Sequence, residues 1–283
     1  MTKKKYFLFC PAYPPPFIGG SKVWTYNMVE NSNLHFNIIT SKLKNKENEL
    51  DTNNKILRYN QIWDKNKLSP THFDLAISYF FMTYLLIKVI ITNFFDRKNL
   101  VIVCGAFTFM NGIIFFLSYI FRIKTIGLGN AEEFTVIIYG QGFKNFFKRI
   151  WLKFTHKKSN KFIVVCDYCK DILTNIGLKK DSITVIPSSV NANKISENKK
   201  NEVINKLTNK DIDILSVGRL IERKGFHKLI MSIKNLKIKF PKIKLIIVGD
   251  GPDLNELIKL IKKNELDQNV EILIDVNDQE LSE

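Results

Sequence analysis

The sequence has 283 residues, a length that suits one large domain or two ordinary ones. Hydrophobic residues make up 45% of the chain, which is enough for a folded core and excludes a largely disordered protein. The formal net charge of +16 favours an anionic partner, such as nucleotide phosphates, an acidic membrane surface or nucleic acid, and does not choose among them.

The first half of the chain alternates short apolar strands with helices. The first predicted strand, Lys5–Cys10, runs into a proline-rich loop that ends in Gly19 and Gly20, just before a predicted helix at Ser21–Glu30. Prolines exclude a helix in this loop, and the two glycines let the backbone approach a ligand closely. Further strands are expected at Phe36–Thr40, Lys55–Asn60, Asp74–Tyr79, Leu100–Cys104, Lys124–Leu128 and Phe162–Val165. This rhythm predicts a parallel sheet with helices on both faces.

Two helical segments raise the question of a membrane. Leu75–Phe95 approaches the length of a membrane span, with Lys88 as its one charged residue; we favour a strand that runs into a helix at Phe81–Phe95. Phe143–Lys158 is predicted to be a basic amphipathic helix. Its apolar side either faces the core, which is the commoner case, or docks on anionic lipid near a lipid-linked acceptor.

The cysteines and the N-terminus indicate a reducing cytoplasm. Cys10, Cys104, Cys166 and Cys169 are interpreted as ordinary thiols. The last two have CxxC spacing, which leaves a redox pair open, but no second pair or suitably spaced histidines complete a zinc site. The basic start of the chain is followed by only a short apolar run, which argues against a signal peptide.

The second half is organised around two strand, glycine turn, helix units. The strand Ile212–Val217 is followed by Gly218, Arg219 and Lys224, and the strand Lys244–Val248 by Gly249-Asp250-Gly251-Pro252. Such turns place backbone N–H groups and helix N-termini at the carboxyl edge of a parallel sheet, where phosphates bind. An arginine adds a bidentate fork and a lysine adds a point charge, so the pair suits two adjacent phosphates.

Together these motifs resemble the retaining nucleotide-sugar glycosyltransferases of family 4, whose GT-B fold has two Rossmann-like domains. The shared pattern is GRL, then KG, then GDGP. The resemblance implies an α/β fold with an acceptor-side domain at residues 1–192, a linker at 193–210 and a donor domain at 211–283. It also implies that Arg219 and Lys224 hold the donor diphosphate. Backbone contacts to the donor are expected from Gly19, Gly20, Gly218, Gly249 and Gly251.

The chain departs from the family pattern in two places. Many relatives have a His-Gly pair after the strand Lys124–Leu128, where this chain has Asn130 and Ala131. Glu132 and Glu133 then either face the acceptor hydroxyl or sit at a helix N-terminus that favours acidic residues, and both interpretations stay open. Relatives also continue past the point that matches Glu283 with a Glu-x7-Glu motif, so a C-terminally truncated chain and an incomplete second domain are expected.

The resemblance implies transfer of a hexose from a nucleotide-diphosphate sugar to a glycan or lipid-linked saccharide, with retention, in cell-surface polysaccharide biosynthesis. No cofactor or metal is expected, because the two cations neutralise the diphosphate. The expected location is cytoplasmic, with peripheral attachment to the inner face of the membrane as an option. The alternative is a truncated or degenerate relative that binds nucleotide or acts as a partner subunit. No nucleic-acid motif is present, so no nucleic-acid partner is expected.

Overall fold

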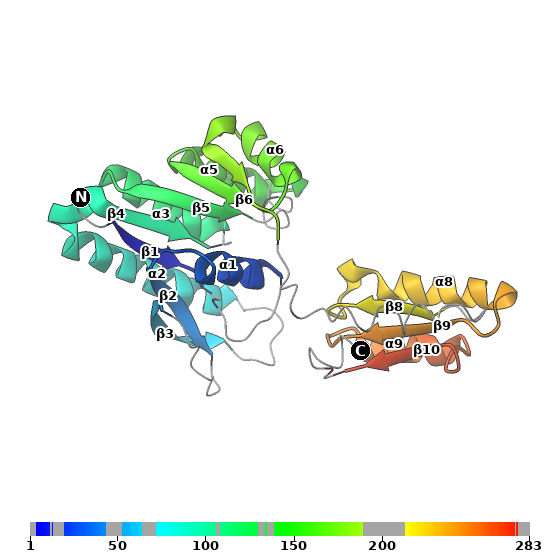
Figure 1. Cartoon of the computed structure of the whole chain (residues 1–283). Coiled ribbons are helices and arrows are strands. Elements are labelled where there is room, and N and C mark those ends of the chain that lie inside the picture. The colour runs from blue at the N-terminus through cyan, green and yellow to red at the C-terminus, as the bar shows by residue number, and fades with distance from the viewer. Residues whose placement is uncertain are drawn as a thin grey trace. The chain divides into compact units, whose positions relative to one another are not determined.

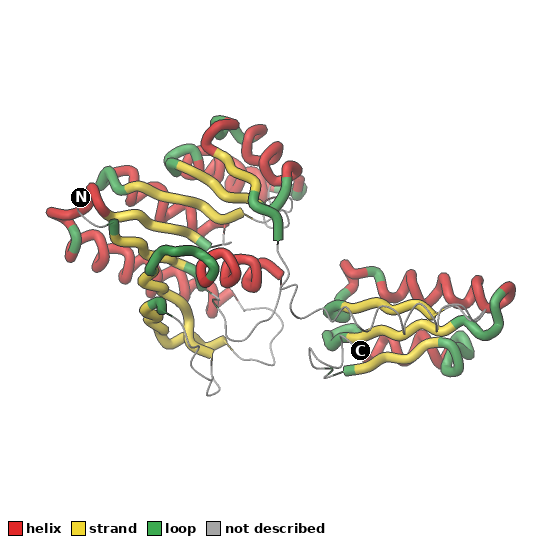
Figure 2. The backbone as a smooth tube through the Cα atoms, viewed as in Figure 1, coloured by secondary structure: helices red, strands yellow, loops and turns green. Residues whose placement is uncertain are grey.

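The computed structural model describes residues 4–11, 13, 20–43, 53–63, 72–105, 108–129, 134, 139–188, 213–274 and 276. The chain divides into two compact units, Met1–Ser189 and Val190–Glu283 (Figure 1). Each unit has its own parallel sheet flanked by helices (Figure 2). The fold class is therefore α/β, as the alternating pattern predicts. The predicted linker at 193–210 lies outside the described residues.

The first unit is built on a seven-stranded sheet in the order β3-β2-β1-β4-β5-β6-β7. Its strands are β1 Lys5–Phe9, β2 Phe36–Leu43, β3 Lys55–Trp63, β4 Leu100–Cys104, β5 Lys124–Gly129, β6 Lys161–Val164 and β7 Ile183–Val185. Every neighbouring pair is parallel, and β1 pairs with both β2 and β4. The direction of strand addition therefore reverses between β1 and β4. In α/β proteins, ligands usually bind at the carboxyl ends of the strands at such a switch point.

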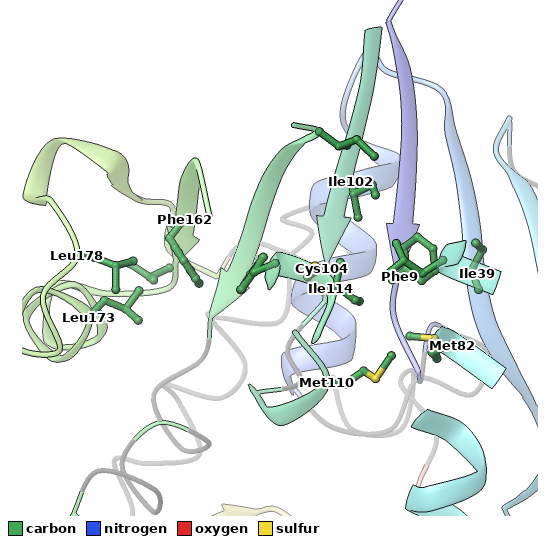
Figure 3. Packing of buried hydrophobic residues seen from close by; sticks show 14 of the residues in the cluster. Phe9, Ile39, Met82, Ile102, Cys104, Met110, Ile114, Phe162, Leu173 and Leu178 are labelled. Carbon is green, nitrogen blue, oxygen red and sulfur yellow. The ribbon is translucent and has the colours of Figure 1, made fainter. Parts of the chain in front are cut away.

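Helices cover both faces of this sheet. They are α1 Gly20–Glu30, α2 His72–Thr92, α3 Thr108–Ile120, α5 Phe143–His156 and α6 Asp167–Asn175, with short 3₁₀ segments η1 Phe94–Asn99 and η2 Lys180–Ser182. Alternate strand residues point to opposite faces. One face carries Leu8 and Ile38, which pack with Trp24 of α1. The other carries Phe9 and Ile102, which pack with side chains of α2, α3 and α6 (Figure 3).

The predicted strand Asp74–Tyr79 is wrong, because these residues belong to the single helix α2. The remaining predicted strands are present, with ends that differ by a few residues. The error has a physical cause. Inner side chains such as Met82 and Leu86 are buried, yet outer ones such as Phe80 and Tyr84 are apolar too. A helix that is apolar all round has no clear 3.6-residue period to distinguish it from a strand.

The second unit has a three-stranded sheet, β10-β9-β8, among the described residues. The strands are β8 Asp213–Val217, β9 Lys244–Val248 and β10 Val270–Leu273, joined by η4 Glu222–Lys224, α8 Phe226–Lys239 and α9 Leu254–Lys263. Ile230 of α8 and Leu257 of α9 pack with Leu245 and Ile247 in one core. Both helices therefore cover the same face. On the opposite face Leu215 and Val217 of β8 are more than half exposed.

Candidate functional site

The first part of the candidate site is the turn that follows β8. The N–H of Gly218 donates to the carbonyl of Val248 at 2.9 Å, so the turn begins where the sheet ladder ends. Leu220 is fully buried in the core of the second unit and anchors the turn. Arg219, between these two residues, is half-buried. Its backbone position is therefore fixed from both sides.

The turn after β9 is hydrogen-bonded directly to the turn after β8. The N–H of Leu220 donates to the carbonyl of Asp250 at 2.9 Å, and the N–H of Asp253 donates to the carbonyl of Leu220 at 3.2 Å. The N–H of Gly249 donates to the carbonyl of Leu273 at 2.9 Å. The two sequence motifs thus form one rigid platform at the carboxyl ends of β8 and β9.

Two glycines of this platform are required by the close approach of the turns. A Cβ on Gly249 would overlap the carbonyl oxygen of Gly218, and Gly249 has φ of 155°. A Cβ on Gly251 would overlap the carbonyl oxygen of Leu220. At Gly218 an added Cβ would meet only the Phe226 ring, at an ordinary 3.5 Å. Packing between loops explains Gly249 and Gly251, while their contact with a donor stays a prediction.

Lys224 lies directly before the N-terminus of α8. Its N–H donates to the carbonyl of Ile221 at 2.9 Å, which closes the short η4 turn, and its side chain is exposed. Gly225 follows in the left-handed conformation with φ of 73° and is the N-cap of α8, with no side-chain hydrogen bond to the cap. The first N–H groups of a helix have no intrahelical partner, and the helix dipole is positive there. Arg219, Lys224 and this helix end all belong to the β8–α8 connection.

In the first unit, the helix α1 follows the carboxyl end of β1 in the chain. Gly20 is the first residue of α1, whose first turn has no acidic residue, and a Cβ on Gly20 would meet nothing within 4 Å of the described atoms. Gly19, Asn130, Glu132 and Glu133, also predicted as site residues, lie outside the described residues.

Sequence reasoning missed Gly105 and Asn111, which lie at the carboxyl end of β4. The N–H of Gly105 donates to the carbonyl of Phe9 at 2.8 Å, and the Asn111 side-chain amide donates to the carbonyl of Gly105 at 3.0 Å. A Cβ on Gly105 would crowd the sulfur of Cys10. The available signal was a glycine directly after the buried strand Leu100–Cys104, which marks a close backbone approach.

Three further features raised by the sequence are metal ligation, a membrane span and the CxxC pair. Within the described residues, no three His, Cys, Asp or Glu side chains gather in a group that could hold a metal ion. Over the same part of the chain, no helix combines the length and apolarity needed to cross a bilayer. Cys166 is exposed at the N-cap of α6 and its sulfur lies 3.4 Å from that of buried Cys169, both as free thiols.

Comparisons with known proteins agree with these motifs. The family described as "Glycosyl transferases group 1" matches residues 197–283. An uncharacterised glycosyltransferase of Methanocaldococcus jannaschii is 48% identical over 59 residues, which cover 21% of this chain and 14% of that protein. The amylovoran biosynthesis glycosyltransferase AmsD of Erwinia amylovora is 32% identical over 120 residues, 42% of this chain and 33% of that protein. The aligned parts thus span less than half of these curated relatives.

The similarity of the folds extends over both units. The crystal structure of HepE from Anabaena, in complex with UDP, has a TM-score of 0.67 at 15% sequence identity and covers 98% of this chain and 71% of its own. At this level of identity the likeness shows the fold alone. The two-unit α/β architecture is therefore of the GT-B type.

Proposed function

Because residues 197–283 match the group 1 glycosyltransferases and the chain has the GT-B fold, we propose that it transfers a hexose from a nucleotide-diphosphate sugar to a saccharide hydroxyl. The UDP bound in HepE supports uridine as the nucleoside of the donor. The acceptor is a glycan or a lipid-linked saccharide, and the anomeric configuration is retained. AmsD, named for amylovoran biosynthesis, supports a role in polysaccharide biosynthesis. We propose that this is cell-surface polysaccharide and that transfer takes place on the cytoplasmic side of the membrane.

The observation that carries this proposal is the platform at the ends of β8 and β9. It holds the backbones of Arg219 and Lys224 beside the N-terminus of α8. During transfer the bond between the anomeric carbon and the diphosphate oxygen breaks, and negative charge grows on the departing diphosphate. Arg219 donates a bidentate fork, Lys224 adds a positive charge, and the helix end adds N–H donors. These interactions strengthen as the charge develops, so they lower the barrier without a metal ion.

The remaining proposed site residues belong to the first unit and follow from the family resemblance. Gly20, at the N-terminus of α1, and Gly19 before it give the sugar phosphate close backbone contact. Asn130 takes the place of the histidine of many relatives and donates a hydrogen bond to the transferred sugar. For Glu132 and Glu133 the proposed role is contact with the acceptor hydroxyl, and the alternative is a place at a helix N-terminus that favours acidic residues.

Replacing Arg219 tests the assignment. Arg219→Ala should lower kcat/KM for transfer by about two to three powers of ten, on the scale of other electrostatic stabilisers of a transition state. The measurement is release of nucleoside diphosphate from UDP-, GDP- and ADP-sugars in the presence of acceptor glycans. Arg223→Ala is the matched control, because Arg223 is an exposed arginine in the same connection between β8 and α8. It should keep the wild-type rate.

Equal turnover by a folded Arg219→Ala variant would remove Arg219 from the site. The alternative function, a non-catalytic nucleotide-binding or partner subunit, is favoured by Asn130 and Ala131 at the position of the His-Gly pair. Calorimetric titration with the same nucleotide sugars separates the two. Binding without turnover by the wild-type chain, over a range of acceptors, would favour the alternative.

A further inference from the structure

Helix α2 carries an apolar stripe on the side that faces away from the core. Phe80, Tyr84, Ile87 and Ile91 are 45–69% exposed. Their spacing of four, three and four residues places them along one side of the helix. The opposite side is buried in the core of the first unit. Since a surface helix normally turns charged residues to water, this outer stripe indicates a partner other than water.

Helix α3 joins this stripe to helix α5. It contacts both neighbours and contains no charged residue. Tyr119 and Ile120 near its C-terminus are more than half exposed, and the ring of Phe116 lies 5.9 Å from the ring of Phe154 of α5. The outer side chains of the three helices therefore form one surface, called here the α2–α3–α5 face. Neighbouring helices pack ~8–10 Å apart and α2 is about 30 Å long, so this face is broad enough to lie on a bilayer.

The apolar side of α5 faces outward, contrary to the core-facing interpretation of its sequence. The buried residues of the helix, Leu152, Thr155 and His156, lie on its other side. The outer side chains are 49–78% exposed, and they are Phe143, Phe146, Phe147, Ile150 and Phe154. The rings of Phe143 and Phe147 meet edge to face, with centroids 4.8 Å apart. Five exposed apolar residues along four helical turns are what an interfacial helix presents to lipid.

Basic residues border this apolar surface. Residues 143–158 include six Lys and Arg residues and no Asp or Glu. By helical periodicity the exposed Lys153 lies at one edge of the α5 stripe, and Lys158 lies in the turn just after the helix ends. The ammonium of Lys158 lies 4.4 Å from the ring centroid of Tyr119 and 5.5 Å from that of Phe154. Lysines in this position can keep their charge at a headgroup while their stems cover apolar surface.

We propose that the α2–α3–α5 face is the docking surface for an anionic lipid bilayer, with the three helices lying in the plane of the interface. A second copy of the chain would also cover apolar side chains, but it would bring two strongly basic helices together. An anionic bilayer accepts the apolar stripes and attracts the basic border at the same time. The inference extends the proposed function by naming the surface that brings the enzyme to lipid-linked acceptors, and it rests on observations independent of the transfer site.

Vesicle binding by the full chain tests the proposal. The probes are vesicles of phosphatidylcholine alone and vesicles with roughly one third phosphatidylglycerol, used without donor sugar. Wild type should partition at least about tenfold more strongly to the anionic vesicles, and added salt should weaken this binding. Phe147→Glu and Ile87→Glu should each lower the partition coefficient about tenfold or more, because each replaces an exposed apolar side chain that would insert into the lipid with an anion.

The matched control is Ile238→Glu, because Ile238 of α8 is 85% exposed and lies in the second unit. This variant should bind vesicles as wild type does. The double variant Lys153→Glu, Lys158→Glu should lose the preference for anionic vesicles. Circular dichroism should show the same melting profile for every variant, because the replaced apolar side chains are largely exposed.

Three results would overturn the proposal. The first is that wild type does not bind anionic vesicles. The second is that Phe147→Glu or Ile87→Glu binds them as strongly as Ile238→Glu does. The third is that wild type is a dimer in light scattering, that Phe147→Glu dissociates this dimer, and that wild type binds no vesicles. This result would assign the α2–α3–α5 face to a second copy of the chain. Arg219→Ala should bind vesicles normally, so a failure of the transfer proposal leaves this result unaffected.

Discussion

His156, the last residue of α5, is fully buried among aromatic rings. Its ring centroid lies 5.1 Å from that of Phe115 and 5.7 Å from that of Phe162. Its Nδ1 lies 3.2 Å from the hydroxyl of Thr155, and its Nε2 has no hydrogen-bond partner among the described residues. Burial lowers the pKa of His156 to about 3, against a smaller opposing effect of a backbone hydrogen bond at Leu152. The imidazole is therefore neutral in the folded protein.

Lowering the pH from 7 to 5 should destabilise the first unit through this residue. The unfolded chain protonates His156 near its ordinary pKa of 6.5, while the folded chain stays neutral down to about pH 3. Between these values the unfolded state binds more protons, so stability falls as the pH falls. The expected loss in the free energy of unfolding is about 2 kcal/mol. Urea unfolding followed by tryptophan fluorescence measures it.

The control for this prediction is His156→Leu, which removes the titrating group and keeps the site apolar. Between pH 7 and pH 5 its free energy of unfolding should fall by about 2 kcal/mol less than that of wild type. If the free energy of unfolding had the same pH dependence in wild type and in the variant, burial would not lower the pKa of His156 and the prediction would be wrong.

The positions of several site residues could be predicted from the sequence. The structural reason why one of them is a glycine could not. The motif spacing predicted that Gly218, Arg219 and Lys224 follow a strand and precede a helix, which the structure confirms. The same motif did not reveal that Gly249 is needed because its backbone lies against Gly218. That contact joins turns from two strands, and such a contact depends on the sheet order rather than on local sequence.

At the scale of elements, strands were more predictable than the sides of helices. Buried parallel strands are short apolar runs between turn residues, so β1, β4 and β9 could be located closely. The helical periodicity of α5 located the helix but not the direction of its apolar side. Periodicity identifies two sides of a helix, and the neighbouring element decides which one is buried.

The packing of α3 on α5 depends on a single glycine. A Cβ on Gly112 would overlap the indole Nε1 of Trp151 and would lie 2.7 Å from the hydroxyl of Thr155. Gly112→Ala should therefore push the two helices apart and lower the free energy of unfolding of the first unit by about 1–3 kcal/mol. Urea unfolding followed by tryptophan fluorescence gives this value.

The comparison for this substitution is Gly20→Ala, also at a helical glycine but with no atom of the described residues within 4 Å of the added Cβ. This second variant should be as stable as wild type or gain up to about 1 kcal/mol, because alanine restricts the unfolded chain. If both variants unfolded at the same urea concentration, close contact at Gly112 would not limit the packing of the helices.

At the scale of the whole molecule, two cores should give two unfolding transitions. The three tryptophans, Trp24, Trp63 and Trp151, all belong to the unit Met1–Ser189. Fluorescence therefore reports on the first unit, and far-ultraviolet circular dichroism reports on both. We expect the two urea curves to differ, with Gly249→Ala shifting only the part seen by circular dichroism, because its Cβ disrupts the platform of the second unit. Coincident curves for both proteins would indicate a single cooperative molecule.

The parallel topology of the first unit has a consequence for how an acceptor arrives. Crossover helices run antiparallel to the strands they connect, so α2, α3 and the sheet have roughly aligned axes. When the helices rest on a leaflet, the strands run along it, and the ends of β1 and β4 open sideways, about one helix diameter above the headgroups. Under the proposed function, a saccharide carried on a lipid would then reach these strand ends by lateral diffusion, a search in two dimensions instead of three.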